Sequence, residues 1–245
     1  GATTTNGILC GIAVTSGNAN IGTTTGNTIG ATSGTGSLYA ATTTSGGMIA
    51  GIYATTANTI TIQNNTIGAI DAMGTTSSIS GSINGINVAG TGGTIVVSGN
   101  TIGNSTNPNL RMGNLTTGSN LSNAGTTFGA ATGISAFNGI LNSQSGTVTI
   151  GTSALPNTIR NVSQNSTSAS SVFNGIQSSA GTTTIASNTI TNISSALTNT
   201  TLSSGALGGV GIYVSAGNTG SAVTLNTISN LSLTNTGTGG YNVAG

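Results

Sequence analysis

The chain has 245 residues but only two basic residues, one acidic residue and no histidine, so charged residues make up 1% of it. This composition excludes most catalytic chemistry, because general acid–base catalysis, an activated serine or cysteine, and the carboxylate pair of a glycosidase all need residues that are missing. It also excludes ligand clusters for zinc or calcium, and the many cationic side chains that nucleic acids and anionic membrane surfaces require.

The first 14 residues, GATTTNGILCGIAV, contain Cys10, the only cysteine. A single cysteine cannot form an intrachain disulfide, and a free cysteine is usually buried, so we expect Cys10 in the core, with an intermolecular crosslink as the alternative. The chain begins at Gly1 without a methionine and shows no signal peptide, which indicates a processed or excerpted form. No stretch approaches about 18 consecutive apolar residues, so we expect no membrane insertion.

Two short motifs then recur along the chain in a fixed order. The pair Gly-Ile begins at Gly11, Gly51, Gly85, Gly139, Gly175 and Gly211. The triplet Asn-Thr-Ile follows each pair and begins at Asn27, Asn65, Asn100, Asn157, Asn188 and Asn226. We regard a further copy at Asn58 as local, because it lies directly before the copy at Asn65. A repeat of about 36 residues is typical of solenoid proteins.

Within each repeat, apolar and polar residues alternate, as in TITI (59–62), TIVV (94–97) and TVTI (147–150). This period of two predicts β-strands and not helices. Each unit has about three short strands and cannot bury both of their faces, so units must stack. We therefore predict an all-β fold, a parallel β-solenoid of about six irregular turns and part of a seventh, with strands ~4.8 Å apart along its axis.

This stacking also accounts for the missing charge. Like charges at equivalent positions of neighbouring turns would repel by about 0.9 kcal/mol even in bulk water. Repeated asparagines instead form hydrogen-bonded ladders, so we expect the Asn of Asn-Thr-Ile to stack with its copies, at a turn where it tolerates left-handed backbone. Ligand binding by these asparagines is the alternative.

The longest interval between Gly-Ile pairs contains NSTNPNLRMGNLTTGSNLSN (104–123), with Pro108 and Arg111. We expect a single solenoid domain over 1–245 with a loop insertion at about 104–130, which is either a tolerated surface insertion or a binding loop. Aromatic residues are few. We expect core or loop-packing roles for Phe128, Phe137 and Phe173, and no aromatic stripe from Tyr39, Tyr53, Tyr213 and Tyr241.

The order Gly-Ile-x-Val, strand, Asn-Thr-Ile resembles the repeat of the right-handed parallel β-helix in the pectin-lyase-like superfamily. The composition is similar to that of the Thr/Gly/Asn-rich β-strand-repeat fibre proteins of bacterial surfaces. The resemblance implies a right-handed β-helix and a bacterial or archaeal cell-surface location. Enzymes of the superfamily carry carboxylates and basic residues on one sheet. Here Asp71, Arg111 and Arg160 have no motif around them, so no catalytic, cofactor-binding or metal-binding residue is assigned.

The terminal sequence GGYNVAG matches the start of a unit, GINVAG at 85–90, and neither end shows a charged cap. Uncapped solenoid ends expose strand edges that pair readily. We therefore expect a structural subunit of an extracellular or cell-surface filament, whose partners are copies of itself docked head to tail.

A binding protein is the alternative, either an adhesin stalk or a β-solenoid that binds ice or surface glycans. Ice binding needs a flat face of regularly spaced threonine pairs, which TIT (59–61), TVT (147–149) and TTT (182–184) suggest. The slots TIV (94–96) and VTL (223–225) break this row. A polysaccharide-degrading enzyme is a third hypothesis, based only on the fold resemblance.

Overall fold

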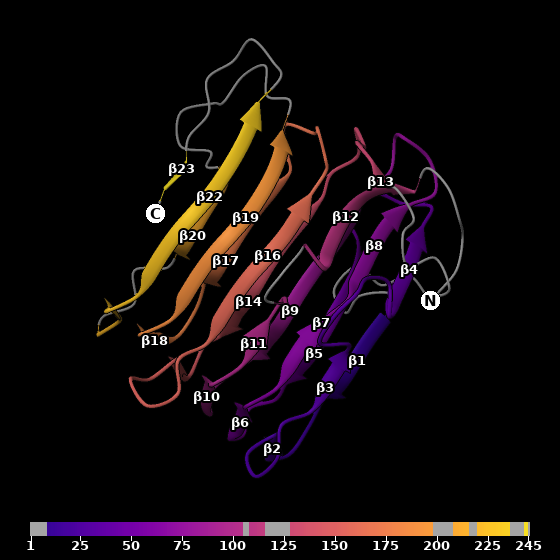
Figure 1. The fold of residues 1–245 in the computed structure, drawn as a ribbon. Coiled ribbons are helices and arrows are strands. Elements are labelled where there is room, and N and C mark those ends of the chain that lie inside the picture. The colour runs from indigo at the N-terminus through magenta and orange to yellow at the C-terminus, as the bar shows by residue number, and fades with distance from the viewer. Residues whose placement is uncertain are drawn as a thin grey trace.

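The computed structural model describes residues 9–104, 108–115, 128–197, 208–215, 220–235 and 243–244. Every regular element in these ranges is a β-strand. The strands form three sheets in which neighbours run parallel, with one short antiparallel pair beside them. Figure 1 shows the coils stacked side by side from the indigo N-terminal end to the yellow C-terminal end. The predicted parallel β-solenoid is confirmed.

Each coil contributes one strand to sheet A, one to sheet B and one or two to sheet C. Sheet A has β1 (Leu9–Val14), β5 (Gly47–Thr55), β9 (Gly81–Gly90), β14 (Ala136–Gln144), β17 (Val172–Ser178), β20 (Gly209–Val214) and β23 (Val243–Ala244). Sheet B has β2 (Ala19–Ile21), β6 (Ile60–Gln63), β10 (Thr94–Ser98), β15 (Thr147–Ile150), β18 (Thr182–Ala186) and β21 (Ala222–Thr224). We number the coils 1 to 6 by their sheet A strands β1 to β20, and β23 begins a seventh.

The number of strands that each coil contributes to sheet C changes along the axis. In coils 1 to 3 it contains two short strands per coil: β3 (Thr28–Gly30) and β4 (Leu38–Thr42), β7 (Thr66–Gly68) and β8 (Ile70–Gly74), and β11 (Thr101–Ile102) and β12 (Leu110–Leu115). In coils 4 to 6 these merge into the single strands β16 (Thr158–Gln164), β19 (Thr189–Leu197) and β22 (Thr227–Asn235). β16 joins the two arrangements, because it pairs with both β11 and β12.

The expected loop at 104–130 differs from the structure over residues 110–115. These residues form β12, which lies in sheet C between β8 and β16. The short strand β13 (Phe128–Gly129) then pairs antiparallel with the end of β12. Leu110 and Met112 of β12 face the core and are fully buried. The Asn-rich composition concealed this alternation. Residues 105–107 and 116–127 lie outside the described part of the chain.

The two sequence motifs pack against each other inside the solenoid. The isoleucines of Asn-Thr-Ile form one continuous column on sheet C, and those of Gly-Ile form another on sheet A. A Cβ built on Gly139 would lie 2.7 Å from Cγ2 of Ile159, and for the other five motif glycines the distance to Cγ2 of their own Asn-Thr-Ile isoleucine is 2.4 to 2.8 Å. Glycine is therefore required because the opposite column fills the space of any side chain.

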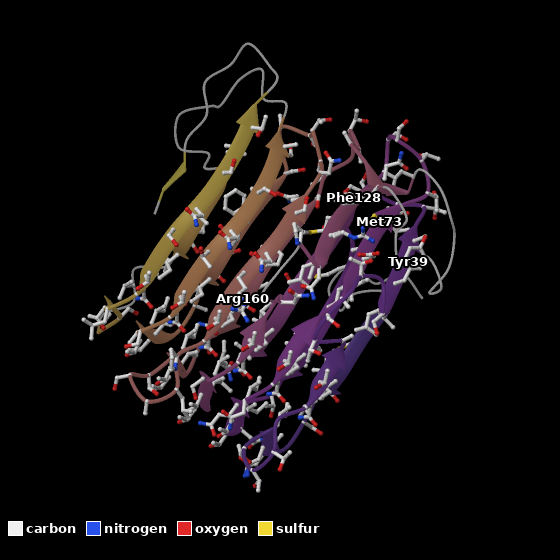
Figure 2. All side chains as sticks on the ribbon, in the orientation of Figure 1. Tyr39, Met73, Phe128 and Arg160 are labelled. Atoms are coloured by element: carbon white, nitrogen blue, oxygen red, sulfur yellow. The ribbon has the colours of Figure 1, made fainter. Side chains whose placement is uncertain are left out.

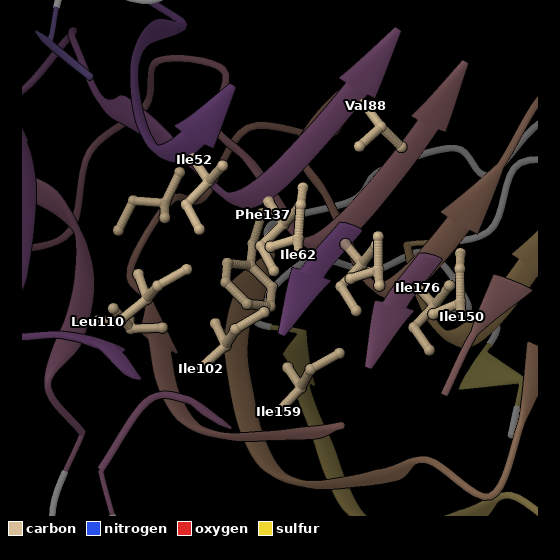
Figure 3. Packing of buried hydrophobic residues seen from close by; sticks show 14 of the residues in the cluster. Ile52, Ile62, Val88, Ile102, Leu110, Phe137, Ile150, Ile159 and Ile176 are labelled. Atoms are coloured by element: carbon tan, nitrogen blue, oxygen red, sulfur yellow. The ribbon is translucent and has the colours of Figure 1, made fainter. Parts of the chain in front are cut away.

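The core is a continuous apolar column along the axis (Figure 3). Ile60, Ile95, Val148 and Ile176, for example, are at most 2% exposed. Phe137 and Phe173 stack in register on sheet A and are also fully buried, as expected from the sequence. Burying one such aliphatic or aromatic side chain contributes roughly 1.5–3 kcal/mol to folding. Stacking therefore supplies the stability that an isolated coil would lack.

Left-handed backbone does not occur where the sequence suggested it. None of the Asn-Thr-Ile asparagines has a positive φ. In several coils the preceding residue turns the corner instead, as at Asn64, Gly99, Ser187 and Leu225, with φ between 56° and 68°. The motif asparagine can then keep ordinary backbone geometry, and its amide is free to point along the axis.

Candidate functional site

Two of the three charged residues form a buried ion pair across sheet C. Asp71 on β8 and Arg111 on β12 are register partners on neighbouring parallel strands. Nε of Arg111 donates to Oδ1 of Asp71 at 2.8 Å, and a terminal guanidinium nitrogen donates to Oδ2 at 2.5 Å. The two residues are 3% and 8% exposed. In this bidentate geometry the two charges neutralise each other. Both carboxylate oxygens of Asp71 accept hydrogen bonds from Arg111 and are therefore not available to a substrate.

Aromatic residues cover this ion pair on both sides. Cζ of Arg111 lies 5.1 Å from the centre of the Phe128 ring, a cation–π distance. Tyr39 on β4 is the register partner of Asp71 on the other side. Burial of the Tyr39 hydroxyl raises its pKa, and the charge of Asp71 raises this pKa further. Figure 2 shows Tyr39, Met73 and Phe128 gathered at one end of the sheet C face. We call Tyr39, Asp71, Arg111 and Phe128 the ion-pair cluster.

Arg160 lies apart from this cluster, near the middle of the same face (Figure 2). It is the register partner of Thr191, and its partly buried side chain has no hydrogen-bond partner at Nε among the described residues. The structure therefore brings together Asp71 and Arg111 but not Arg160. In the described ranges no three His, Cys, Asp or Glu residues gather to hold a metal ion. The same ranges contain no helix long and apolar enough to span a membrane.

Cys10 lies at the N-terminal end of sheet A and is only partly buried, whereas we expected it in the core. Its Sγ atom donates to the carbonyl of Ile12 at 3.0 Å. Burial raises the pKa of this thiol, and backbone hydrogen bonds with Tyr53 and Ile12 oppose that rise. The protonated thiol is a poor nucleophile, so nothing at this position points to catalysis.

The six Asn-Thr-Ile asparagines form an unbroken ladder at the corner between sheets B and C, as predicted. Nδ2 of each asparagine donates to Oδ1 of the asparagine in the next coil, at distances of 2.8 to 3.0 Å. Each backbone N–H donates to the same oxygen, at 2.9 to 3.3 Å. Nδ2 also donates to a main-chain carbonyl of an adjacent coil, as Asn157 does to Val97.

This ladder is polar, because every hydrogen bond between two of these asparagines is donated toward the C-terminal end. At the N-terminal end, Oδ1 of Asn27 accepts no hydrogen bond from the described residues. At the C-terminal end, the backbone N–H of Asn226 donates to none of them. Asn226 accepts from Asn188 and donates from Nδ2 to the carbonyls of Ile185 and Thr224. One end of the ladder therefore presents an acceptor, Oδ1 of Asn27, and the other presents a donor, the backbone N–H of Asn226.

At the C-terminal end of the solenoid, coil 6 exposes two apolar side chains: Val223 at a core position, and Leu225 at the corner that Asn64, Gly99 and Ser187 occupy in other coils. Val223 is 50% exposed and Leu225 is 83% exposed, whereas Ile185, the register partner of Val223 in coil 5, is fully buried. These side chains line a shallow hollow together with Ile212, Val214, Thr224, Asn226 and Ile228. At the N-terminal end, Leu9, Ile12, Val14 and Ala19 are also only partly buried. Both ends therefore show the apolar surface that internal coils cover.

Sequence reasoning predicted the asparagine ladder but missed the ion pair. Asp71 and Arg111 are 40 residues apart, which is close to one repeat. Both follow an inward-facing apolar residue, Ile70 and Leu110, in an alternating pattern. Opposite charges one repeat apart on the same face would have been the signal. The Asn-rich composition around Arg111 predicted a loop there, so this pairing of charges was not expected from the sequence.

The chain matches no known protein family, no curated protein and no solved structure. The structure supports a parallel β-solenoid, and no family match supports the more specific resemblance to the pectin-lyase-like superfamily.

Proposed function

We propose that this protein is a structural subunit of an extracellular or cell-surface filament, in which copies stack head to tail through the ends of their solenoids. The observation that carries the proposal is the exposed apolar end of coil 6, which repeats a surface that internal coils bury. Burying such a surface contributes about 25 cal/mol for each Å² removed from water. Another coil of the same kind is the partner that fits it best, since every internal coil already binds one.

The polarity of the asparagine ladder gives this stacking a direction. Asn226 of one copy presents its backbone N–H at the same corner where Asn27 of a second copy presents Oδ1. Each internal step of the ladder joins these same two groups, as in the 2.9 Å bond from the Asn188 N–H to Asn226 Oδ1. Head-to-tail docking would continue the ladder across the junction, whereas head-to-head docking would bring two acceptors together. A repeated head-to-tail contact of this kind produces an open filament.

The short strand β23 lies at the end where a second copy would dock. Val243 and Ala244 of β23 pair with Gly209 and Val210, and so cover the first part of β20. These two residues occupy the place that the start of β1 would take in a second copy. Docking of a second copy over all three sheets would therefore displace β23 from β20 in sheet A. Truncation before residue 239 is expected to speed assembly for this reason.

The scarcity of charge agrees with an extracellular material. Only two arginines and no lysine offer cleavage sites to trypsin-like proteases. Arg111, one of the two, is buried in its ion pair. We expect the folded chain to resist trypsin, and an extended digestion followed by mass spectrometry measures this.

The test is electron microscopy and light scattering of the chain in neutral buffer, with two matched variants. Val223→Lys places a charge on the apolar end, whereas Ala222→Lys, the neighbour on β21, places it on the outer face. We expect fibres from the wild type and from Ala222→Lys, with a ~4.8 Å repeat along the axis. We expect isolated rods from Val223→Lys. Isolated rods in all three samples, or equal assembly of the two variants, would overturn the proposal.

A further inference from the structure

The outer face of sheet B carries a regular two-column array of threonines over coils 2 to 5. The outward-facing side chains of this array are exposed or half-exposed, and they alternate along each strand with buried side chains. The first column is Thr59, Thr94, Thr147 and Thr182, and the second is Thr61, Val96, Thr149 and Thr184. Seven of these eight positions are threonine. We call this set the threonine face.

The structure corrects how these positions align. The sequence suggested that VTL (223–225) in coil 6 occupies the same slot and interrupts the array. The register instead pairs Thr184 with Ala222, and Ile185 with Val223, so VTL lies three residues further along. The array therefore ends at coil 5, and Val96 is the one substitution inside it. Valine has the same branched shape as threonine, with a methyl group in place of the hydroxyl.

The register places the side chains of the threonine face on a two-dimensional lattice. Neighbouring strands lie ~4.8 Å apart, and residues i and i+2 on one strand lie roughly 6.6 Å apart. β-Branched side chains have few χ1 rotamers, so the hydroxyl and methyl groups repeat in fixed positions. The intervening Ile60, Ile95 and Val148 are at most 2% exposed and hold the backbone beneath. Such a face can order a layer of water whose oxygens repeat at its own spacings.

We propose that the threonine face binds ice. The face repeats in two directions, as a crystal plane of ice does, and its hydroxyl groups can join that lattice while its methyl groups fill the hollows. No strand of sheet B contains a charged residue. A neutral face is complementary to a neutral lattice, and strongly hydrated charges there would compete with it. The face also has no aromatic residue on which a sugar ring could stack, so a glycan is a poorer fit.

Sheet C supplies an internal control for this proposal. It carries its own column of six threonines in register, from Thr28 to Thr227. The neighbouring outward positions are Gly30, Gly68, Gly103, Arg160, Thr191 and Ser229, so no second column accompanies it. A single column gives a line of hydroxyls and not a two-dimensional lattice.

The experiment measures thermal hysteresis and inhibition of ice recrystallisation by the purified chain. Thr149→Tyr disturbs the centre of the threonine face, and Thr158→Tyr makes the same change on sheet C of the same coil. We expect activity for the wild type and for Thr158→Tyr, loss of activity to the buffer baseline for Thr149→Tyr, and a gain for Val96→Thr. Thermal melts followed by circular dichroism confirm that each variant folds.

The same measurements on Val223→Lys separate ice binding from filament assembly, because this change leaves the threonine face intact. Activity in that variant would support the threonine face whether or not filaments form. No hysteresis and no recrystallisation inhibition in either the wild type or Val223→Lys would overturn the proposal, as would equal losses in Thr149→Tyr and Thr158→Tyr.

Discussion

Coils 4 and 6 carry the same motifs but lie in different surroundings. Asn157 of coil 4 is completely buried and has ladder partners in coils 3 and 5. Asn226 of coil 6 is only partly buried and has a ladder partner on one side. Ile150 is fully buried, whereas Val223, two register steps further along the same column, is half exposed. Burial in this protein is therefore set by the neighbouring coils and not by the repeat itself.

The strongest test of this difference is the pair Asn157→Ala and Asn226→Ala. The first change leaves the buried Asn100 N–H without its acceptor, at a cost of about 1–3 kcal/mol. It also removes three side-chain hydrogen bonds worth about 0.5–1.5 kcal/mol each, although the Val97 carbonyl keeps the Gly151 N–H and Oδ1 of Asn188 keeps the N–H of residue 157 as donors. We expect a loss of about 5 kcal/mol in the free energy of unfolding for Asn157→Ala, and about 2 kcal/mol for Asn226→Ala. Urea denaturation followed by circular dichroism measures both. Equal losses would mean that the ladder is not cooperative along the axis.

The second test truncates the same core column in the two coils. Ile150→Ala leaves a cavity in a filled core and should cost about 2–5 kcal/mol. Val223→Ala removes atoms that are already half in water, so we expect a cost of about 0.5 kcal/mol or less in the isolated rod. In assembled fibres the cost of Val223→Ala should rise toward that of a buried valine. Melting temperatures of rods and fibres provide the comparison, and identical values would argue against burial of coil 6 in the fibre.

A smaller effect is expected at the motif glycines. A Cβ at position 139 would lie 2.5 Å from the carbonyl oxygen of Gly175 and 2.7 Å from Ile159. A Cβ at position 211 would meet Ile228, which is partly buried and can move toward the open end. Overpacking costs about 1–3 kcal/mol, and we expect Gly139→Ala near the top of that range and Gly211→Ala near the bottom. Denaturant midpoints of the two variants test this order.

The smallest effect concerns Tyr39 in coil 1, whose pKa is raised by burial and then by Asp71. A group with a raised pKa in the folded state stabilises the fold fully below its unfolded pKa of about 10, and this contribution is lost as the pH rises through the folded value. The stability of the wild type should therefore fall more steeply above pH 10 than that of Tyr39→Phe. For Asp71→Asn, absorbance titration of the phenolates should show a partial decrease in this pKa, because burial remains. An unchanged titration would exclude a contribution from Asp71.

The sequence predicted the architecture and the asparagine ladder because both depend on repetition. Six copies of Gly-Ile and Asn-Thr-Ile in fixed order require equivalent positions to stack, and an amide is the side chain that can donate and accept along a stack. The left-handed residue was placed one position too late. Asn, Ser, Gly and Leu all occupy that corner, so composition alone does not mark it.

The Asp71–Arg111 pair and the end of the threonine face could not be read in the same way. Each depends on the register between coils of unequal length, and the interval that contains Arg111 is the longest in the chain. Placing β12 beside β8 brings the two charges together, and pairing Thr184 with Ala222 fixes where the threonine columns end.

The sequence by itself therefore determined that this chain is a charge-poor, all-β stack of repeats with an apolar core and an amide ladder, because alternation and repetition are local properties. Only the tertiary structure decided which residues are buried, which charges meet and where the threonine face ends. These outcomes follow from the alignment of each coil on its neighbour, which is set by packing across the core and not by any single segment.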